Sequence, residues 1–237
     1  MLVSTELQKK ELEQKLKEYN LHIPNIEVIL ASGLDKFHYP ALSRKPYSLL
    51  TVSRLDSCKR LDWIIHSTIK AHKINPLISL DIYGEGPSWI AQSLQQIVNE
   101  NHAESYIHFM GHCDVSEKYA QYEVFISASV FETLGLSIME AIGSGNALIG
   151  LDVKYGNRQF IKHNYNGLLT NFDISLQDEP GYVEKVIQDI SNNILALFSD
   201  QEKLITFQQN SYKIANDFFN SKIEKAWIDF FTKILNN

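Results

Sequence analysis

The sequence is poor in cysteine and has no long apolar run, and these absences exclude several classes of protein. It contains 2 cysteines in 237 residues, Cys58 and Cys113, with no C-x-x-C pair and no closely spaced Cys/His cluster. That usage excludes a disulfide scaffold, does not suggest a zinc site, and fits a reducing, cytoplasmic setting. No apolar stretch approaches the length of a membrane span, and the N-terminus leads into charged residues without a signal-peptide core. We therefore expect a soluble, cytoplasmic protein.

Excess positive charge is also lacking. The chain has 22 Lys and Arg against 28 Asp and Glu, a formal net charge of −6. This balance argues against broad binding of nucleic acid or of anionic membranes, although it permits a local basic pocket for phosphate. The hydrophobic content of 44% is enough to build a full core.

The first 45 residues predict one helix and a linker. Residues 4–19 carry Leu7, Leu12 and Leu16 at near-helical spacing, and Ser4 or Thr5 is suited to cap the start. Residues 26–30 predict a short strand, followed by a turn at 31–35 and a polar stretch with two prolines, Pro40 and Pro46.

From residue 47 onward, short apolar segments alternate with helical ones. This alternation is typical of βαβ units and predicts a doubly wound, Rossmann-like α/β fold with six parallel strands and helices on both faces. The expected strands are 47–53, 77–83, 106–110, 124–127, 147–151 and 167–170, and the expected helices between them are 60–73, 89–101, 116–121 and 136–143. Three further helices are expected at 181–199, 201–217 and 220–235.

Ligands of such sheets bind at the carboxyl ends of the strands, and four candidate sites fall there. The first is the segment 53–59, in which Arg54 and Lys59 precede a helix. Two cations near a helix N-terminus suit a diphosphate, because the helix adds free N–H groups and a favourable dipole. A solvated basic loop is the alternative.

The second and third candidates follow the next two strands. Gly84 opens the turn Gly-Glu-Gly-Pro at 84–87, which permits tight backbone passage near a ligand, or is an ordinary turn into a helix. His112 follows Gly111 and is placed to meet a nucleobase, or is simply a surface histidine.

The fourth candidate is a pair of glutamates, Glu132 and Glu140, separated by seven residues with Gly135 between them. If a helix starts near Gly135, the backbone N–H groups of Gly135 and Leu136 point at a phosphate. The flanking carboxylates accept hydrogen bonds from vicinal hydroxyls, as on a ribose or a sugar. Such a pair also arises often by chance, so the motif gains weight only together with the other three.

Taken together, the ordered motifs of residues 26–170 resemble the retaining glycosyltransferases of GT-B fold and family-4 (group 1) type. The chain is similar to their C-terminal, donor-binding half. The motifs that carry the resemblance are the joining segment 26–35 with Phe37, Val-Ser-Arg-Leu at 52–55 with Lys59, Ile-Tyr-Gly-Glu-Gly-Pro at 82–87, Phe-Met-Gly at 109–111, the Glu-x7-Glu element within 129–145, and Asn-Gly-Leu-Leu at 166–169.

The resemblance implies roles for these residues. Arg54 and Lys59 neutralise the diphosphate of a nucleotide-sugar, most naturally a UDP-sugar, without a metal or other cofactor. Glu140 holds the ribose hydroxyls and Glu132 contacts the transferred sugar.

The remaining site residues implied by the resemblance bind through the backbone or the base. Gly135 and Leu136 present N–H groups to phosphate and sugar, His112 lies where the family places base contacts, and Gly84 belongs to a signature turn of the donor site.

Three segments depart from the usual family pattern. Ser53 replaces a usual Gly, and Thr133-Leu134 replaces a usual Gly-Phe, which puts the shape of the sugar pocket in doubt. The segment Asp-Val-Lys-Tyr-Gly-Asn at 152–157 stands in place of a Gly-rich loop with a Glu. This form resembles bacterial enzymes that glycosylate teichoic acids or serine-rich surface adhesins.

The resemblance implies that an acceptor-binding half is missing. We therefore expect residues 1–45 to be a helix and crossover remnant of that half, 46–180 the nucleotide-sugar-binding domain, and 181–237 helices that pack on this domain or on the missing half. Leu7, Leu12 and Leu16, together with Trp227, Phe230 and Phe231, either face that half or pack within this chain. The chain is either a fragment or a natural single-domain protein.

The leading hypothesis is a donor-binding domain that serves transfer of a hexose or N-acetylhexosamine to a protein or a cell-envelope polymer. The alternative is a non-catalytic partner or regulatory subunit of a full-length glycosyltransferase. Another GT-B activity, such as an epimerase or a phosphorylase, is a minor third possibility.

Overall fold

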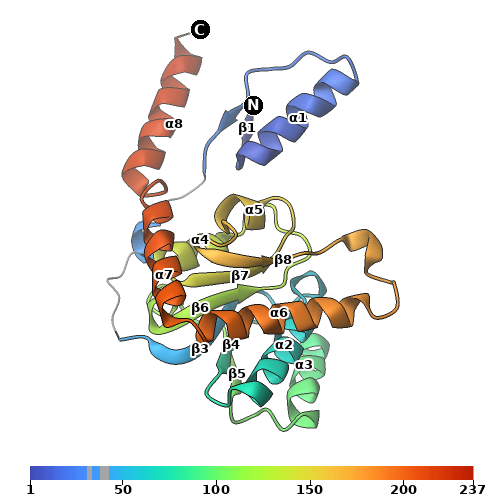
Figure 1. Ribbon diagram of the computed structural model, residues 1–237. Coiled ribbons are helices and arrows are strands. Elements are labelled where there is room, and N and C mark those ends of the chain that lie inside the picture. The colour runs from blue at the N-terminus through green and yellow to red at the C-terminus, as the bar shows by residue number, and fades with distance from the viewer. Residues whose placement is uncertain (31–33, 38–42, 237) are drawn as a thin grey trace.

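The molecule is built on a central parallel sheet with helices on both faces (Figure 1). The structure is a computed structural model that describes residues 1–30, 34–37 and 43–236. The sheet contains six strands in the order β5-β4-β3-β6-β7-β8, all parallel. The strands are β3 (Lys45–Val52), β4 (Ser79–Tyr83), β5 (Ile107–Gly111), β6 (Tyr122–Ser127), β7 (Ala147–Leu151) and β8 (Gly167–Thr170).

The direction of winding reverses between β3 and β6. From β3 the chain proceeds outward to β4 and β5 on one side, then returns past β3 to add β6, β7 and β8 on the other. The carboxyl ends of β3 and β6 therefore diverge into opposite connections, which is where doubly wound sheets bind their ligands. The predicted six-stranded, doubly wound fold is confirmed.

Both faces of the sheet are buried because successive strand residues point to opposite sides. In β3, Leu49 belongs to the core on one face and Leu50 to the core on the other. The first face is covered by α2 (Leu61–Ile74), α3 (Ser88–Glu100) and α6 (Tyr182–Phe198). The second is covered by α4 (Leu136–Gly143) and by the end of α7 (Gln201–Ala215).

Two connections differ from their sequence-based description. The helix expected at 116–121 is instead a 3-10 helix, η3 (Tyr119–Gln121), because Asp114 accepts the Ser116 N–H in a turn and β6 begins at once after η3. The segment after β7, expected to be only turns, contains a five-residue helix, α5 (Gly156–Phe160). The short 3-10 helices η2 (Ser57–Lys59) and η4 (Ile174–Leu176) complete the connections around the sheet.

The N-terminal segment forms a small unit of its own. Helix α1 (Glu6–Glu18) is capped by Thr5 in a capping box with Gln8, as the sequence indicated. It connects β1 (Leu2–Val3) to β2 (Glu27–Val28), which pair in parallel as a separate two-stranded sheet. The expected strand at 26–30 is thus reduced to two residues, and the turn residues 31–33 and Pro40 lie outside the described residues. Within the described part, the joining segment continues as the 3-10 helix η1 (Asp35–Phe37).

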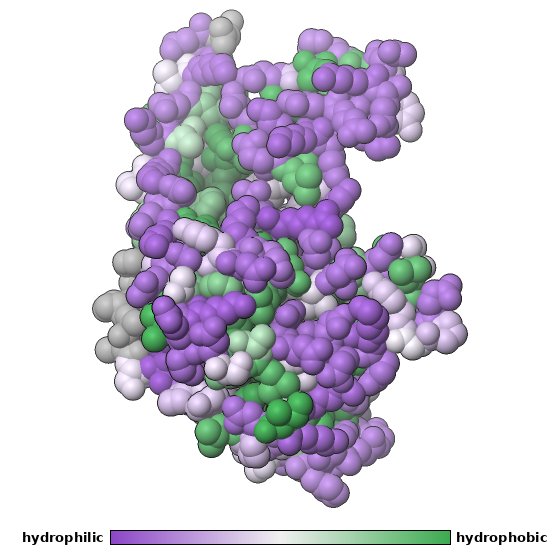
Figure 2. All heavy atoms as spheres, viewed as in Figure 1, coloured by the Kyte–Doolittle hydropathy of each residue, from purple (hydrophilic) through white to green (hydrophobic). Residues whose placement is uncertain are grey.

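The last helix, α8 (Asn220–Leu235), extends away from the sheet beside the N-terminal unit (Figure 1). Trp227 donates its ring N–H to the Leu30 carbonyl at 3.0 Å, and Lys233 forms an ion pair with Glu27 at 2.9 Å. Apolar surface remains on the side of α8 toward the N-terminal unit (Figure 2). Within α8, Phe231 is 53% exposed. The terminal helices therefore pack partly within this chain, whereas a role facing a missing half stays a prediction.

No helix within the described ranges combines the length and apolar character needed to cross a membrane.

Candidate functional site

The four candidate sites converge at the carboxyl ends of β3, β4, β5 and β6. We call residues 53–60, which follow β3, the β3 loop, and residues 128–135, which follow β6, the β6 loop. A cavity of about 730 Å³ opens between the β3 loop, the turns after β4 and β5, and the first turns of α4, which follows the β6 loop. Five of the eight predicted site residues line it: Arg54, Gly84, His112, Leu136 and Glu140. Lys59, Glu132 and Gly135 lie in the two loops but are not among its lining residues.

The backbone of the β3 loop is held by the neighbouring turn, while its arginine remains free to move. The Leu55 N–H donates to the Glu85 carbonyl at 2.9 Å, and Asp56 caps η2 by accepting the Cys58 N–H at 3.0 Å. The Arg54 side chain is 79% exposed, and its guanidinium lies 3.6 Å from the Asp56 carboxylate. Such an exposed pair contributes little to stability, so the arginine is available for an anion.

Gly84 has a structural role that the sequence did not reveal. Its φ is 134°, and a side-chain carbon there would lie 1.8 Å from the Ser53 carbonyl oxygen. Its N–H donates to the Gly111 carbonyl at 2.9 Å. Gly84 therefore joins the ends of β3, β4 and β5, and the close backbone passage that was expected near a ligand is a passage against Ser53.

Helix α4 begins next to Gly135, which is the position that the predicted role of Glu132 and Glu140 depended on. Gly135 is its N-terminal cap, with a φ of 80° that a glycine adopts without strain. Glu132 lies in the β6 loop and Glu140 inside the helix. The first N–H groups of an α-helix have no partner within the helix, so the N-terminus of α4 is suited to bind an anion.

Glu132 is paired across the site with Lys59. The Lys59 ammonium lies 2.7 Å from the Glu132 carboxylate, and the two side chains are only 17% and 16% exposed. The pair connects the β3 loop to the β6 loop. Because it is largely shielded from water, its two charges interact more strongly than those of a surface pair.

Glu140 is held by a residue that the sequence reading missed. The buried Tyr119 donates its hydroxyl to one Glu140 oxygen at 2.7 Å. Burial raises the pKa of Glu140, and this hydrogen bond offsets part of the rise. Tyr119 precedes Glu140 by 21 residues in another element, so no local motif connects them.

Other residues line the cavity although the sequence did not single them out as site residues. Val52, Tyr83 and Val115 supply the apolar wall of the cavity, and the exposed Cys113 lies beside His112 at its rim. An apolar wall with few polar groups is common in pockets that hold an organic ligand.

The described residues include no group of three or more His, Cys, Asp or Glu side chains arranged to hold a metal ion. The charged residues that line the cavity are Arg54, Glu85 and Glu140, and Lys59 and Glu132 lie in the adjoining loops.

Comparison with known proteins shows which family the chain matches and which proteins it is similar to. The profile of the glycosyl transferases group 1 matches residues 46–192. Over 98% of its length the chain is 40% identical to the UDP-N-acetylglucosamine--peptide N-acetylglucosaminyltransferase GtfA subunit of Streptococcus gordonii, of which it covers 44%. The chain thus spans about half the length of the curated relatives it matches.

Two solved structures have the same architecture. A crystal structure of the pneumococcal O-GlcNAc transferase GtfA in complex with UDP and GlcNAc superposes with a TM-score of 0.91 at 36% identity, over 100% of this chain and 45% of that one. A crystal structure of a GtfA/B complex superposes with a TM-score of 0.90 at 38% identity, over 100% and 45%. These matches confirm the resemblance drawn from the motifs, including the subgroup that the segment 152–157 indicated.

Proposed function

The chain belongs to the glycosyl transferases group 1, and from this premise we propose that it binds the donor of a retaining glycosyltransferase that uses UDP-N-acetylglucosamine. The observation that carries the proposal is the cavity at the switch point, which brings Arg54 and Glu140 together beside the Lys59–Glu132 pair. The relatives support the identity of the donor, since one is named for UDP-N-acetylglucosamine and another was solved with UDP and GlcNAc.

The diphosphate lies between the β3 loop and the start of α4 in this proposal. Arg54 turns from Asp56 to donate two parallel hydrogen bonds, and Lys59 adds a second positive charge. The N–H groups of Gly135 and Leu136 complete the cradle. No metal ion is needed, because these groups together offset the negative charge.

The nucleoside occupies the part of the cavity lined by Glu140 and His112. One Glu140 oxygen is taken by Tyr119, which leaves the other to accept hydrogen bonds from the two ribose hydroxyls. His112 lies at the rim, where it meets the base.

The sugar lies toward the β6 loop, where Glu132 accepts hydrogen bonds from its hydroxyls. In transfer, the bond between the anomeric carbon and the diphosphate oxygen breaks, and the leaving UDP carries the electron pair and negative charge. Arg54, Lys59 and the N-terminus of α4 stabilise that developing charge. The acceptor hydroxyl adds to the anomeric carbon with retained configuration, and its proton passes to the leaving diphosphate.

The acceptor and partners belong to the whole protein of which such a domain is part. We propose a protein or peptide acceptor, as in the name of the Streptococcus gordonii relative, with a cell-envelope polymer as the alternative. We also propose a cytoplasmic location, supported by the free cysteines Cys58 and Cys113.

A second function is favoured by one observation, the solved GtfA/B complex, in which a similar chain is assembled with another protein. In this alternative the chain serves as a non-catalytic partner of a full-length transferase, with the exposed side of α8 as contact surface. The terminal helices are then the part that matters, and the cavity need not bind a donor.

Calorimetry with the chain and UDP, UDP-N-acetylglucosamine and ADP tests the donor proposal. We expect the two uridine nucleotides to bind and ADP, which carries the same diphosphate on another base, to bind at least about tenfold more weakly. A folded chain that binds neither uridine nucleotide at millimolar concentration contradicts donor binding. Association with a full-length transferase in sizing experiments, without nucleotide binding, favours the partner role.

A further inference from the structure

The segment after β7, residues 152–158, contacts the β6 loop through the backbone of Glu132. It contains one of the three stretches whose sequence departs from the usual family pattern. We propose that Tyr155 and Gly156 are positioning residues for the sugar end of the donor site, because their backbones fix Glu132 and the start of α4. This proposal rests on the donor-binding function proposed above.

The first observation is a backbone clamp on Glu132. Its carbonyl accepts two hydrogen bonds, from the Tyr155 N–H at 2.7 Å and from the Gly156 N–H at 2.9 Å, and its own N–H faces the Lys154 carbonyl at 3.5 Å. Residues 132 and 155 thus pair as an isolated parallel bridge. These hydrogen bonds fix the main chain of Glu132, while its carboxylate faces Lys59.

The second observation is the absence of a side chain at position 156. A carbon there would lie 2.1 Å from the Leu134 carbonyl oxygen and 3.0 Å from the Gly135 nitrogen. The peptide that leads into α4 therefore rests directly on the Gly156 backbone. Any larger residue pushes Glu132 and Gly135 outward, toward the sugar side of the cavity.

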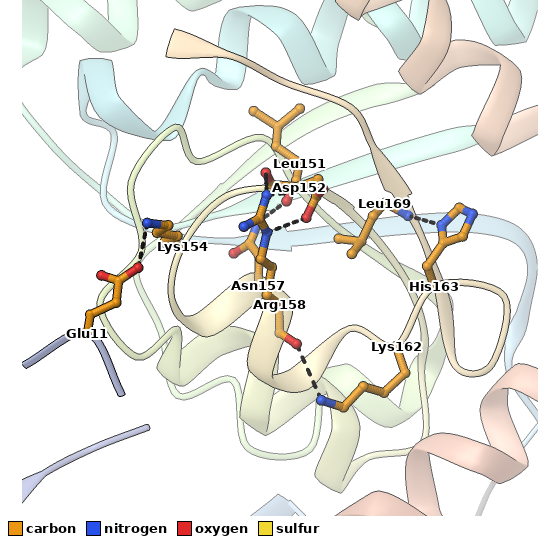
Figure 3. Close-up of polar contacts among 9 residues, drawn as sticks. All are labelled: Glu11, Leu151, Asp152, Lys154, Asn157, Arg158, Lys162, His163 and Leu169. Atoms are coloured by element: carbon orange, nitrogen blue, oxygen red, sulfur yellow. Dashed lines mark hydrogen bonds and ion pairs between the residues drawn. The ribbon is translucent and has the colours of Figure 1, made fainter. Parts of the chain in front are cut away.

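The base of the segment is fastened to the sheet, as Figure 3 shows. The Arg158 guanidinium donates to the Asp152 carboxylate at 2.6 Å, and the buried Asn157 donates its amide to the Leu151 carbonyl at 2.8 Å. The Asp152 N–H in turn donates to the Thr170 carbonyl of β8 at 2.7 Å. Because its base is bonded to β7 and to β8 and is braced internally by the Arg158–Asp152 pair, the segment transmits a push at Gly156 to the β6 loop and does not absorb it.

The outer side of the segment is held by the N-terminal helix. Glu11 of α1 forms an ion pair with Lys154 at 2.5 Å (Figure 3). Glu11 also accepts the Tyr155 hydroxyl at 2.8 Å. These bonds lower the pKa of Glu11, the Lys154 contact most. The N-terminal unit is thereby connected to the backbone of Glu132 through Lys154 and Tyr155, and Gln8 adds a direct hydrogen bond to the Thr133 carbonyl of the β6 loop at 3.4 Å.

The segment touches the sugar end of the proposed site and not the nucleoside end. Neither Tyr155 nor Gly156 lines the cavity that contains Arg54 and Glu140. Displacing the β6 loop therefore removes contacts of Glu132 with the sugar directly, and affects the diphosphate indirectly, through Lys59 and the start of α4. Binding of a UDP-sugar is thus more sensitive to Gly156 than binding of UDP.

The test is Gly156→Ala, with UDP and UDP-N-acetylglucosamine affinities measured by calorimetry. We expect about tenfold weaker binding of the nucleotide-sugar and at most about threefold weaker binding of UDP. The matched control is Gly167→Ala, whose added carbon meets the Leu148 carbonyl at 2.5 Å in the sheet and does not contact the β6 loop. It should lower the melting temperature while changing both affinities equally.

Equal losses of the two ligands in folded Gly156→Ala, or no loss, overturn the inference and leave the proposed function intact. Failure of the unsubstituted chain to bind UDP overturns the proposed function itself.

Hydrogen exchange of the unsubstituted chain decides the matter if Gly156→Ala does not fold. The Tyr155 and Gly156 amides donate to Glu132, so UDP-N-acetylglucosamine should slow their exchange about threefold more than UDP does. Glu11→Gln, which leaves this backbone intact, should speed the exchange of both amides. Equal slowing by the two ligands overturns the inference.

Discussion

The two loops at the switch point hold their charged side chains in different ways. In the β3 loop the backbone is tied to the turn after β4, but the Arg54 side chain is 79% exposed and has one loose contact at 3.6 Å. In the β6 loop, Glu132 belongs to a pair in which both side chains are less than a fifth exposed, and its backbone is bonded to residues 155 and 156.

This difference indicates a division of labour within the proposed donor site. A side chain that is already fixed loses little conformational freedom when a ligand binds, whereas a free arginine must be ordered by the ligand it contacts. The sugar side is thus preorganised and the phosphate side adapts. Lys59 belongs to both, because it extends from the β3 loop to Glu132.

Removing Lys59 should have the largest effect, because it breaks the ion pair between the two loops and leaves them joined by the hydrogen bond from the Val130 N–H to the Cys58 carbonyl at 3.0 Å. Lys59→Ala deletes a proposed phosphate ligand and leaves a shielded Glu132 without its partner, so we expect UDP-N-acetylglucosamine to bind roughly 30–100-fold more weakly. Calorimetry measures this. The matched control is Lys70→Ala, which removes the 2.8 Å ion pair between Lys70 of α2 and Glu184. It should change the affinity less than about twofold.

A loss in Lys59→Ala no greater than that in Lys70→Ala contradicts the bridging role. If uridine, which has no phosphate, loses as much affinity as UDP, Lys59 does not meet the diphosphate.

Removing Arg54 should have the next largest effect on ligand binding, and it should leave stability unchanged. Arg54→Ala is expected to weaken UDP binding about tenfold, since a charge-assisted contact to phosphate is lost. The melting temperature should not change, because the side chain is exposed. Calorimetry at low and high salt measures the loss of UDP affinity and shows how far salt screens the contact. Lys185→Ala, a substitution on the outer side of α6, is the control. It should bind UDP as tightly as the unsubstituted chain.

An unchanged UDP affinity in Arg54→Ala shows that the arginine does not turn to the ligand, and the contrast between the loops then has no functional meaning. A large drop in melting temperature shows that Arg54 is structural.

Substituting Glu140 should have the smallest effect on UDP affinity. The pH dependence of that affinity should have a direction that follows from the pKa of Glu140. Because burial raises its pKa, Glu140 takes up a proton at a higher pH than an ordinary glutamate. As the pH falls through that raised pKa, the oxygen that accepts ribose hydroxyls is lost, and UDP should bind a few-fold more weakly. Comparing Glu140→Gln with the unsubstituted chain by calorimetry across pH cancels the titration of UDP itself, and the variant should lack this added dependence.

The same substitution should raise the melting temperature at neutral pH. A glutamate whose folded pKa is raised contributes stability below its unfolded pKa, and this contribution is lost as the pH rises through the folded pKa. Glu140→Gln removes that cost of burying a charged carboxylate. A variant that is less stable at neutral pH, or one that keeps the full pH dependence, contradicts this account of Glu140.

Much of the fold could be predicted from the sequence because its signals are local. Alternating apolar segments predicted six strands, and the three C-terminal helices lie within about two residues of their expected bounds, as at α6 (Tyr182–Phe198) against 181–199. Helix α5 was missed because five residues that begin Gly-Asn look like a turn. The division of the chain at residues 45 and 180 stays a prediction.

The sequence singled out Arg54 and Glu140, which line the cavity, and Gly135, which caps α4, but not the residues that support them. Arg54 follows a strand, and Gly135 and Glu140 belong to the helix that follows the next inner strand, where parallel sheets bind ligands. Their roles stay predictions. Tyr119 and Gly156 were missed as site residues because each acts on a residue 21 or more positions away in the chain.

By itself, the sequence determined the order of strands and helices, the glycines that turn the chain, and the charged side chains at the strand ends. These follow from hydrophobic periodicity and backbone freedom, which act over a few residues. Only the tertiary structure decided which charges meet: Arg54 stays in solvent, Lys59 crosses to Glu132, and Tyr119 takes one side of Glu140. Such contacts depend on how the elements pack, because two side chains 73 residues apart, as Lys59 and Glu132 are, meet only once the sheet brings their loops together.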